Sequence, residues 1–150
     1  MPHPTVKKEN WQFSIKKYVI DNLKRNDGIE ILTDRFQAPS DPIITRWCVL
    51  RNGTDIHGTF KAYTFELYAV TRKDPESIEL IRLCDKITDY FLSDTSITDG
   101  YKRIPFYDKD TKEVIGQMLV TDFKDSDEIN GPDQSKFKIY TIIVKMAVIS

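Results

Sequence analysis

One stretch, residues 59–92, constrains the fold more than any other because it places a long strand directly before an amphipathic helix. The strand half is rich in aromatic and β-branched residues, and its apolar side chains alternate. Asp74 and Pro75 then predict an N-cap and a first helical position. The predicted core-facing residues are Tyr63, Phe65, Leu67 and Ala69 in the strand and Leu80, Leu83, Cys84, Ile87 and Phe91 in the helix. A helix with one apolar stripe needs a sheet to cover it.

The periodicity of the remaining chain predicts the element order α, β, β, β, α, β, β, β. A first helix is expected at about 9–25 and a second from Pro75 to about 93. Besides the long strand, strands are expected at 29–33, 43–51, 101–107, 114–123 and 137–149. This order predicts an α+β fold in which a mainly antiparallel β-sheet packs with two α-helices. The 150 residues are expected to form a single domain, with residues 1–9 as a flexible arm.

The last predicted strand, residues 137–149, is apolar on both faces. One face would carry Phe137, Ile139 and Ile143, and the other Tyr140 and Ile142. Two helices cover only one face of a sheet, so a strand buried on both faces needs a second cover. We expect another subunit to supply it.

Two loops are expected to project from this core. Asn52 and Gly53 form a strong turn signal, which predicts a hairpin whose tip, residues 52–58, protrudes and carries His57. Residues 124–135 are polar, acidic and rich in turn formers, which is typical of a long mobile loop.

Composition excludes several classes of protein. The 22 basic and 23 acidic side chains give a net charge of -1, so there is no basic excess for gripping nucleic acid. No apolar segment is long enough for a membrane helix, and the N-terminal residues lack the apolar core of a secretory signal. Cys48 and Cys84 are predicted to be buried free thiols. We expect synthesis in the cytoplasm and no membrane contact.

No pattern of catalytic or ligand-binding residues is present. His3 and His57 are isolated from any second histidine or cysteine at metal-ligand spacing. The acidic stretches that begin at Asp108 and Asp125 lack the glycine and glutamate of a calcium-binding loop. Nucleophile elbows and phosphate-binding glycine loops are missing from the sequence as well. The sequence therefore predicts a protein without cofactor or metal that is not an enzyme and that acts through its surfaces.

A nucleic-acid-binding module of the cytosol is an alternative from a different class. Basic and aromatic residues alternate along the predicted strands, as they do on surfaces that stack single-stranded bases. These residues are Arg46, Lys61, Arg72, Lys102 and Arg103, with Trp47, Tyr63, Phe65 and Tyr101. At neutral net charge, basic residues on the solvent face of strands with an aromatic core face are the favoured interpretation.

Several segments together carry a family resemblance. They are WQFSIKKYVIDNL followed by DG, DPIITRWCVL, GTFKAYTFELYAV, PESIELIRLCDKITDYF, VIGQMLVTDF and KFKIYTIIVKMAV, which span about residues 10–149. In their order this chain resembles the tail terminator proteins of long-tailed bacteriophages, a family of minor tail and head-tail joining proteins.

The resemblance implies a virion structural protein at the tail-neck junction. Such a protein forms a ring, usually a hexamer, that caps the tail tube, ends tail growth and joins the tail to the head. The implied partners are further copies of the chain, the tail tube protein and a head-neck connector protein, while DNA passes through without specific binding. Another head-tail connector or neck component is the alternative within this class.

Two hypotheses about surfaces follow from the implied ring. An acidic lining would repel passing DNA, so we expect the acidic loop to face the lumen or the tube. Its residues are Asp125, Asp127, Glu128 and Asp133. The outer face of the long strand and the predicted hairpin tip are expected to contact a neighbouring subunit or partner. Their residues are Phe60, Thr64, Tyr68, Asn52, Gly53 and His57.

Overall fold

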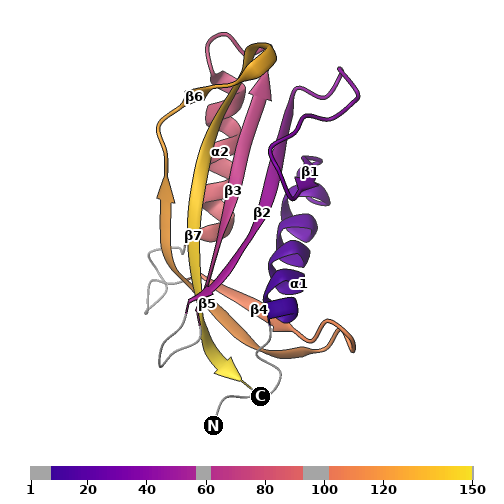
Figure 1. Ribbon diagram of the computed structural model, residues 1–150, viewed down its shortest axis with the longest axis vertical. Helices are drawn as coiled ribbons and strands as arrows, with labels where there is room; N and C mark the ends of the chain where they lie inside the picture. The colour runs from indigo at the N-terminus through magenta and orange to yellow at the C-terminus, as the bar shows by residue number, and fades with distance from the viewer. Residues whose placement is uncertain (1–7, 57–61, 93–101, 150) are drawn as a thin grey trace.

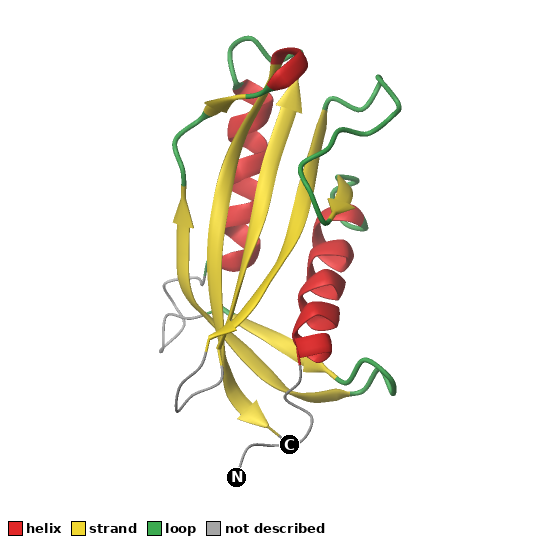
Figure 2. Ribbon diagram, viewed as in Figure 1, coloured by secondary structure: helices red, strands yellow, loops and turns green. Residues whose placement is uncertain are grey.

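The computed structural model describes residues 8–56, 62–92 and 102–149 of the chain (Figure 1). Its elements, in chain order, are α1 (Lys8–Val19), a π-helical turn (Ile20–Lys24), β1 (Glu30–Thr33), β2 (Arg46–Ile56), β3 (Ala62–Arg72), α2 (Ile78–Phe91), β4 (Arg103–Tyr107), β5 (Val114–Asp125), β6 (Ile129–Asn130), a 3-10 turn (Pro132–Gln134) and β7 (Ser135–Ile149). The fold is α+β and dominated by its sheet, as predicted (Figure 2).

The strands form one seven-stranded sheet in the order β1-β2-β3-β7-β5-β4, and β6 also pairs with β7. Among the strands that the structure describes, only the β1–β2 pair is parallel, so the predicted mainly antiparallel sheet is confirmed. The long strands β3 and β7 lie at its centre, with Leu67 opposite Tyr140. The sheet is strongly curled, and β4 and the first half of β5 bend toward the start of α1 (Figure 1).

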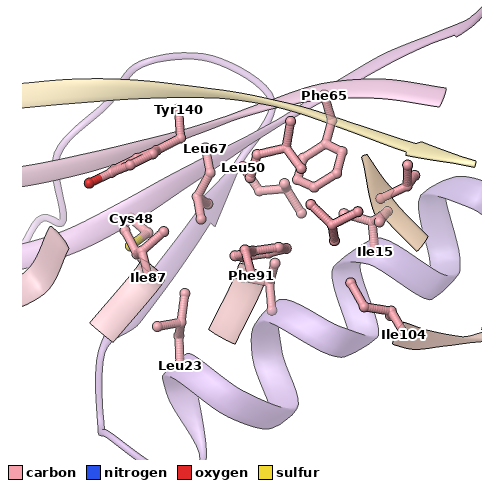
Figure 3. Close-up of a cluster of buried hydrophobic side chains, with 14 of the residues drawn as sticks. Ile15, Leu23, Cys48, Leu50, Phe65, Leu67, Ile87, Phe91, Ile104 and Tyr140 are labelled. Atoms are coloured by element: carbon pink, nitrogen blue, oxygen red, sulfur yellow. The ribbon is translucent and has the colours of Figure 1, made fainter. Parts of the chain in front are cut away.

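The main core lies between the two helices and one face of the sheet (Figure 3). The predicted strand residues and all of the predicted helix stripe except Cys84 are fully buried in it, and Cys84 is half-buried. Trp11 of α1 stacks on Tyr63, with ring centroids 5.7 Å apart, and meets the edge of Phe106 at 5.0 Å. Both helices therefore cover the same face.

The opposite face of the sheet carries a smaller cluster. Trp47, Val49, Tyr68 and Val70 are buried there. The loop of residues 34–45 folds over them, and Phe36 lies 4.9 Å from Phe137 of β7 by ring centroids. The sequence predicts that another subunit covers this side of β7. That expectation is wrong for Phe137 and Ile139, which pack within the chain itself.

The first helix begins at Lys8, so the last two residues of the expected flexible arm are helical, while residues 1–7 lie outside the described part. The helix ends in a π-helical turn in which the N–H of Arg25 donates to the carbonyl of Ile20. Gly28 then adopts a φ of 68°, the left-handed conformation in which many helices end.

The prediction of a protruding hairpin tip at 52–58 is wrong for residues 52–56, the part of it that the structure describes. β2 continues to Ile56 and pairs with β3, with a shift of register between Arg51 and Thr54. Asn52 and Gly53 therefore form a bulge rather than a turn. A Cβ atom on Gly53 would lie 1.3 Å from the carbonyl oxygen of Thr64, so only glycine fits this close approach. His57 and Phe60 lie outside the described residues.

The start of α2 differs from the prediction, since the helix begins at Ile78 rather than Pro75. Asp74 nevertheless caps it. Its carboxylate accepts hydrogen bonds from the N–H groups of Glu79 at 3.2 Å and Leu80 at 2.9 Å. The intervening turn places Ser77 at a φ of 60°.

The segment 124–135, predicted to be a mobile loop, is instead tied to β7. β5 extends to Asp125, and β6 pairs with β7 at Phe137 and Lys136. Ser126 accepts a hydrogen bond from the N–H of Ile139 at 2.9 Å and donates its own N–H to the carbonyl of the same residue. Polar composition suggested a solvated loop, but these backbone hydrogen bonds are formed with a strand that is distant in sequence.

Candidate assembly interface

One candidate interface is the loop of residues 34–45, which is held rigidly over the sheet. The guanidinium of Arg72 donates to the carbonyl oxygens of Ile44 at 2.8 Å and Asp41 at 2.6 Å. The indole N–H of Trp47 donates to the carbonyl of Gln37 at 2.9 Å. Backbone carbonyls are thus satisfied along the loop, which is typical of a preorganised structure.

Ile43 projects from this rigid loop into solvent. Its side chain is 84% exposed, more than that of any other large hydrophobic residue described, while the next residue, Ile44, turns inward. The carboxylate of Asp41 accepts the N–H of Ile43 at 3.0 Å and so fixes the turn. An exposed aliphatic side chain on an ordered loop loses little conformational entropy when it binds, which suits it as an interface anchor.

A groove beside α2 is the second candidate interface. It has a volume of about 330 Å³ and lies between α2 and the strands β5 and β7. Leu80, Ile81, Cys84 and Tyr140 contribute to its lining, but Leu80 and Tyr140 are almost fully buried, so the surface that the groove exposes is mostly polar. Ile81 stands at the lip and is 58% exposed.

Charged side chains also line this groove. Asp125 and Lys138 form an ion pair at 2.6 Å, and their hydrogen bond lowers the pKa of Asp125 and raises the pKa of Lys138. Asp85 and Glu128 also line the groove, and both are exposed. With one pair neutralised, the remaining charge of the rim is negative.

The phenol of Tyr140 and the thiol of Cys84 in this groove are neutral at physiological pH. Burial, together with the neighbouring Cys84, raises the pKa of the Tyr140 hydroxyl far above its ordinary value. Burial also raises the pKa of the Cys84 thiol. A neutral phenol and a neutral thiol are not activated nucleophiles, so the groove is suited to binding rather than to covalent chemistry.

The two candidate interfaces lie on opposite faces of the sheet. The loop packs against the cluster of Trp47 and Tyr68, whereas α2 packs on the face of the main core.

The edge strand β4 is partly closed by α1, because Ser14 accepts the N–H of Tyr107 at 2.8 Å and Asn10 accepts the N–H of Lys109 at 2.9 Å. A partner strand cannot use those two N–H groups without displacing α1.

The residues predicted to contact a neighbouring subunit differ in how far they are exposed on the surface. Tyr68 is 8% exposed because Phe36 and Phe137 cover its ring, so the expectation that it meets a neighbour is wrong. Thr64 is half-buried and Asn52 is exposed.

The four carboxylates of the predicted acidic loop do not lie together on the surface. Asp125 and Glu128 meet in the groove beside α2. Asp133 instead lines a separate cavity with Phe36 and Trp47, and Asp127 is exposed. The four carboxylates therefore do not form one surface within the chain.

Sequence reasoning missed Ile43 and Ile81 as surface residues. Ile43 was assigned to the start of a strand, but β2 begins at Arg46 because Arg72 holds the preceding residues in a loop. Ile81 lies beside the apolar stripe of α2, and its apolar side chain in an exposed position was a usable signal.

The alternative function, binding of single-stranded nucleic acid, requires exposed aromatic rings on which bases can stack. Trp47, Tyr63 and Phe65 are all buried in the two clusters. Arg72 is committed to loop carbonyls, and Arg46 lies 3.9 Å from Glu79. Buried rings cannot stack on bases, so these strands lack the platform that such binding requires.

Within the described residues, no three His, Cys, Asp or Glu side chains are placed to hold a metal ion. The acidic turn at Asp108 has a structural use, since that carboxylate accepts the N–H groups of Asp110 and Thr111 at 2.9 and 3.0 Å. None of the helices in the described ranges has the length and apolar character needed to cross a membrane.

No protein-family model matches the chain, and no curated protein matches it. One solved structure, whose name describes no function, superimposes on 95% of this chain and 96% of its own. The TM-score is 0.64 and the sequence identity is 9%. At this identity the likeness concerns the fold alone.

Proposed function

We propose that this protein is a virion structural subunit that assembles with copies of itself into a ring at the tail-neck junction of a long-tailed bacteriophage. The ring would cap the tail tube, end its growth and join the tail to the head. Its partners would be the tail tube protein and a head-neck connector protein, and its action would need no cofactor.

One observation carries the proposal of a ring. The protein presents two unlike surfaces on opposite faces of its sheet, the loop that exposes Ile43 and the mostly polar groove beside α2 with Ile81 at its lip. Two different surfaces on one subunit favour head-to-tail assembly, which generates a ring when the rotation closes. A symmetric dimer would instead need one self-complementary surface.

The assignment to a phage tail rests on the family resemblance. The order of elements on which the resemblance rests is present, with two helices on a mainly antiparallel sheet. The net charge of -1 and the exposed Asp127 and Glu128 accord with a ring that DNA crosses without being held. In this proposal those carboxylates are the ones nearest the lumen or the tube.

Imaging of the purified protein tests the proposal. Mass photometry and negative-stain microscopy over a range of concentrations should show closed rings with a central hole, with six subunits as the expected number. A protein that stays monomeric at high concentration, also when mixed with tail tube protein, would contradict it. Salt-dependent binding of single-stranded oligonucleotides by the monomer would favour a nucleic-acid-binding module instead.

A further inference from the structure

We propose that Asn130 is a site of spontaneous covalent modification in the folded protein, where its side-chain amide is converted to a carboxylate. The chain has two Asn-Gly pairs, Asn52-Gly53 and Asn130-Gly131. Asparagine before glycine is especially prone to this reaction, because glycine has no side chain that shields its backbone nitrogen. The structure restrains the two pairs differently, and this difference points to Asn130.

The reaction needs only water and the chain itself. The backbone nitrogen of the glycine attacks the side-chain carbonyl carbon (Cγ) of the asparagine and closes a five-membered succinimide ring. The side-chain nitrogen leaves as ammonia and takes the proton of the attacking nitrogen with it. Water then opens the ring at either carbonyl, which gives aspartate or isoaspartate. The glycine N–H must therefore leave its hydrogen bond, and the backbone must rotate, before the ring can close.

Gly53 is held between two long strands. Its N–H donates to the hydroxyl of Tyr63 at 2.9 Å, and the side chain of Tyr63 is buried in the main core. β2 pairs with β3 on both sides of the bulge. A Cβ atom on Gly53 would lie 1.3 Å from the carbonyl oxygen of Thr64, so the two backbones are in close contact. Ring closure at Asn52 therefore requires β2 to separate from β3.

Asn130 lies at the end of a much shorter strand (Figure 1). β6 has two residues, and its pairing with β7 ends where Asn130 meets Lys136. A Cβ atom on Gly131 would meet side-chain atoms of Ser135 and Phe137 rather than backbone. Side chains change rotamer more readily than paired strands separate, so Gly131 is the less restrained of the two glycines.

The turn after β6 also favours opening at Gly131. The N–H of Gly131 donates to the carbonyl of Ser135 at 2.8 Å, across a turn in which Asp133 and Gln134 adopt left-handed φ values of 54° and 61°. This conformation is strained for residues other than glycine. Local opening costs least in short elements, so the nitrogen of Gly131 should become free more often than that of Gly53.

The product would change the charge of this surface. Asn130, Lys73 and Lys136 line one cavity of about 510 Å³, so a carboxylate at position 130 would form near two ammonium groups. Asp74 also lines this cavity, but its carboxylate is bound by N–H groups of α2. An isoaspartate would in addition lengthen the main chain by one methylene and disturb the register of β6 with β7.

Peptide mapping of the intact, folded chain tests the assignment. The protein is kept at neutral pH for weeks, and digests taken at intervals are analysed by mass spectrometry for replacement of NH₂ by OH. Asn130 should be converted at least about 10-fold faster than Asn52. In guanidinium chloride, where neither glycine is restrained, the two rates should agree within about 3-fold. Faster conversion of Asn52 in the folded protein, or the same ratio with and without denaturant, would overturn the proposal.

Two variants of the full chain separate the restraint from the sequence. Asn130→Gln keeps an amide but cannot close the five-membered ring, so conversion at position 130 should disappear. Tyr63→Phe keeps the buried ring and removes the hydroxyl that holds Gly53, so conversion of Asn52 should rise roughly 5-fold while that of Asn130 stays unchanged. Circular dichroism should show both variants folded. Acceleration at both sites alike, or at neither, would contradict the view that restraint of the glycine nitrogen sets the rates.

Discussion

Arg72 lies with its terminal nitrogen 2.6 Å from the carbonyl oxygen of Asp41, which precedes it by 31 residues. A second nitrogen of the same guanidinium donates to the carbonyl of Ile44 at 2.8 Å, and the guanidinium lies over the ring of Trp47 at 5.1 Å. One side chain of β3 thus joins the loop of residues 34–45 to the sheet and sets the direction in which Ile43 points.

Replacing Arg72 with alanine should release this loop. The change removes the hydrogen bonds to Asp41 and Ile44, so we expect a loss of about 1–3 kcal/mol in the free energy of unfolding. Amide hydrogen exchange should accelerate at residues 37–45 more than in the core strands. Urea unfolding and exchange measured by mass spectrometry check both effects.

Arg25→Ala is the control for that experiment. Arg25 is exposed, and its ion pair with Asp21 at 3.3 Å is a surface pair four residues apart on a helix. Its removal should leave stability within about 0.5 kcal/mol of the natural protein. Equal losses for the two variants would show that Arg72 acts only as a surface charge.

Gly53→Ala should be strongly unfavourable although it adds a single methyl group. The new Cβ atom would lie 1.3 Å from the carbonyl oxygen of Thr64, so β2 must move away from β3 at the bulge. The cost should be about 1–3 kcal/mol, as for overpacked sites elsewhere. Chemical denaturation measures it, and Gly28→Asn, at a left-handed position with no atom within 4 Å, should cost clearly less.

Tyr68→Glu should unfold the protein rather than yield a folded monomer. The tyrosine ring is sandwiched near Phe36 and Phe137, with centroids 5.9 and 5.8 Å away, and a carboxylate there would lose its hydration. We expect a loss of roughly 3 kcal/mol or more. Tyr68→Phe keeps the ring and should remain folded. A stable, folded Tyr68→Glu variant would contradict the burial of this side chain.

Asp74→Asn should change how stability depends on pH. Burial raises the pKa of Asp74, but hydrogen bonds from Leu80, Glu79 and Thr71 outweigh it, so the pKa in the folded state lies below the ordinary 3.8. A lowered folded pKa contributes stability above the unfolded value, and that contribution is lost as pH falls through the folded value.

At pH 7 the Asp74→Asn variant should therefore be less stable by about 1–3 kcal/mol, because the amide keeps only one of the two acceptor oxygens and leaves one of the N–H groups of Glu79 and Leu80 without its partner. The difference from the natural protein should shrink as the pH falls below about 3.8. Urea unfolding between pH 7 and pH 2 gives both values. Asp110→Asn, on an exposed turn, serves as the control, and a gap that stays constant with pH would exclude the proposed role of the carboxylate.

Local sequence patterns correctly predicted the helices and strands that bury one face along their whole length. The alternation of Tyr63, Phe65 and Leu67 identified the buried face of β3, and the stripe through Leu83 and Ile87 identified that of α2. Such patterns succeed because one face of each element meets the same core along its whole length. The α+β class followed from the order of those elements.

The errors arose where a distant segment decides the local structure. Asn52 and Gly53 have the composition of a turn, but the backbone of Thr64 passes so close that they form a bulge in a continuing strand. The acidic segment after Asp125 has the composition of a free loop, yet β7 supplies its hydrogen-bond partners.

By itself the sequence determined which faces of β3 and α2 are buried, that the sheet is mainly antiparallel, and that no known catalytic pattern is present. Only the tertiary structure decided that Phe137 and Ile139 of β7 pack with residues of the chain's own loop, and that Ile43 and Ile81 are left exposed. The reason is physical. Periodicity reports burial along one element, whereas a groove or an exposed anchor arises from how separate elements meet in space.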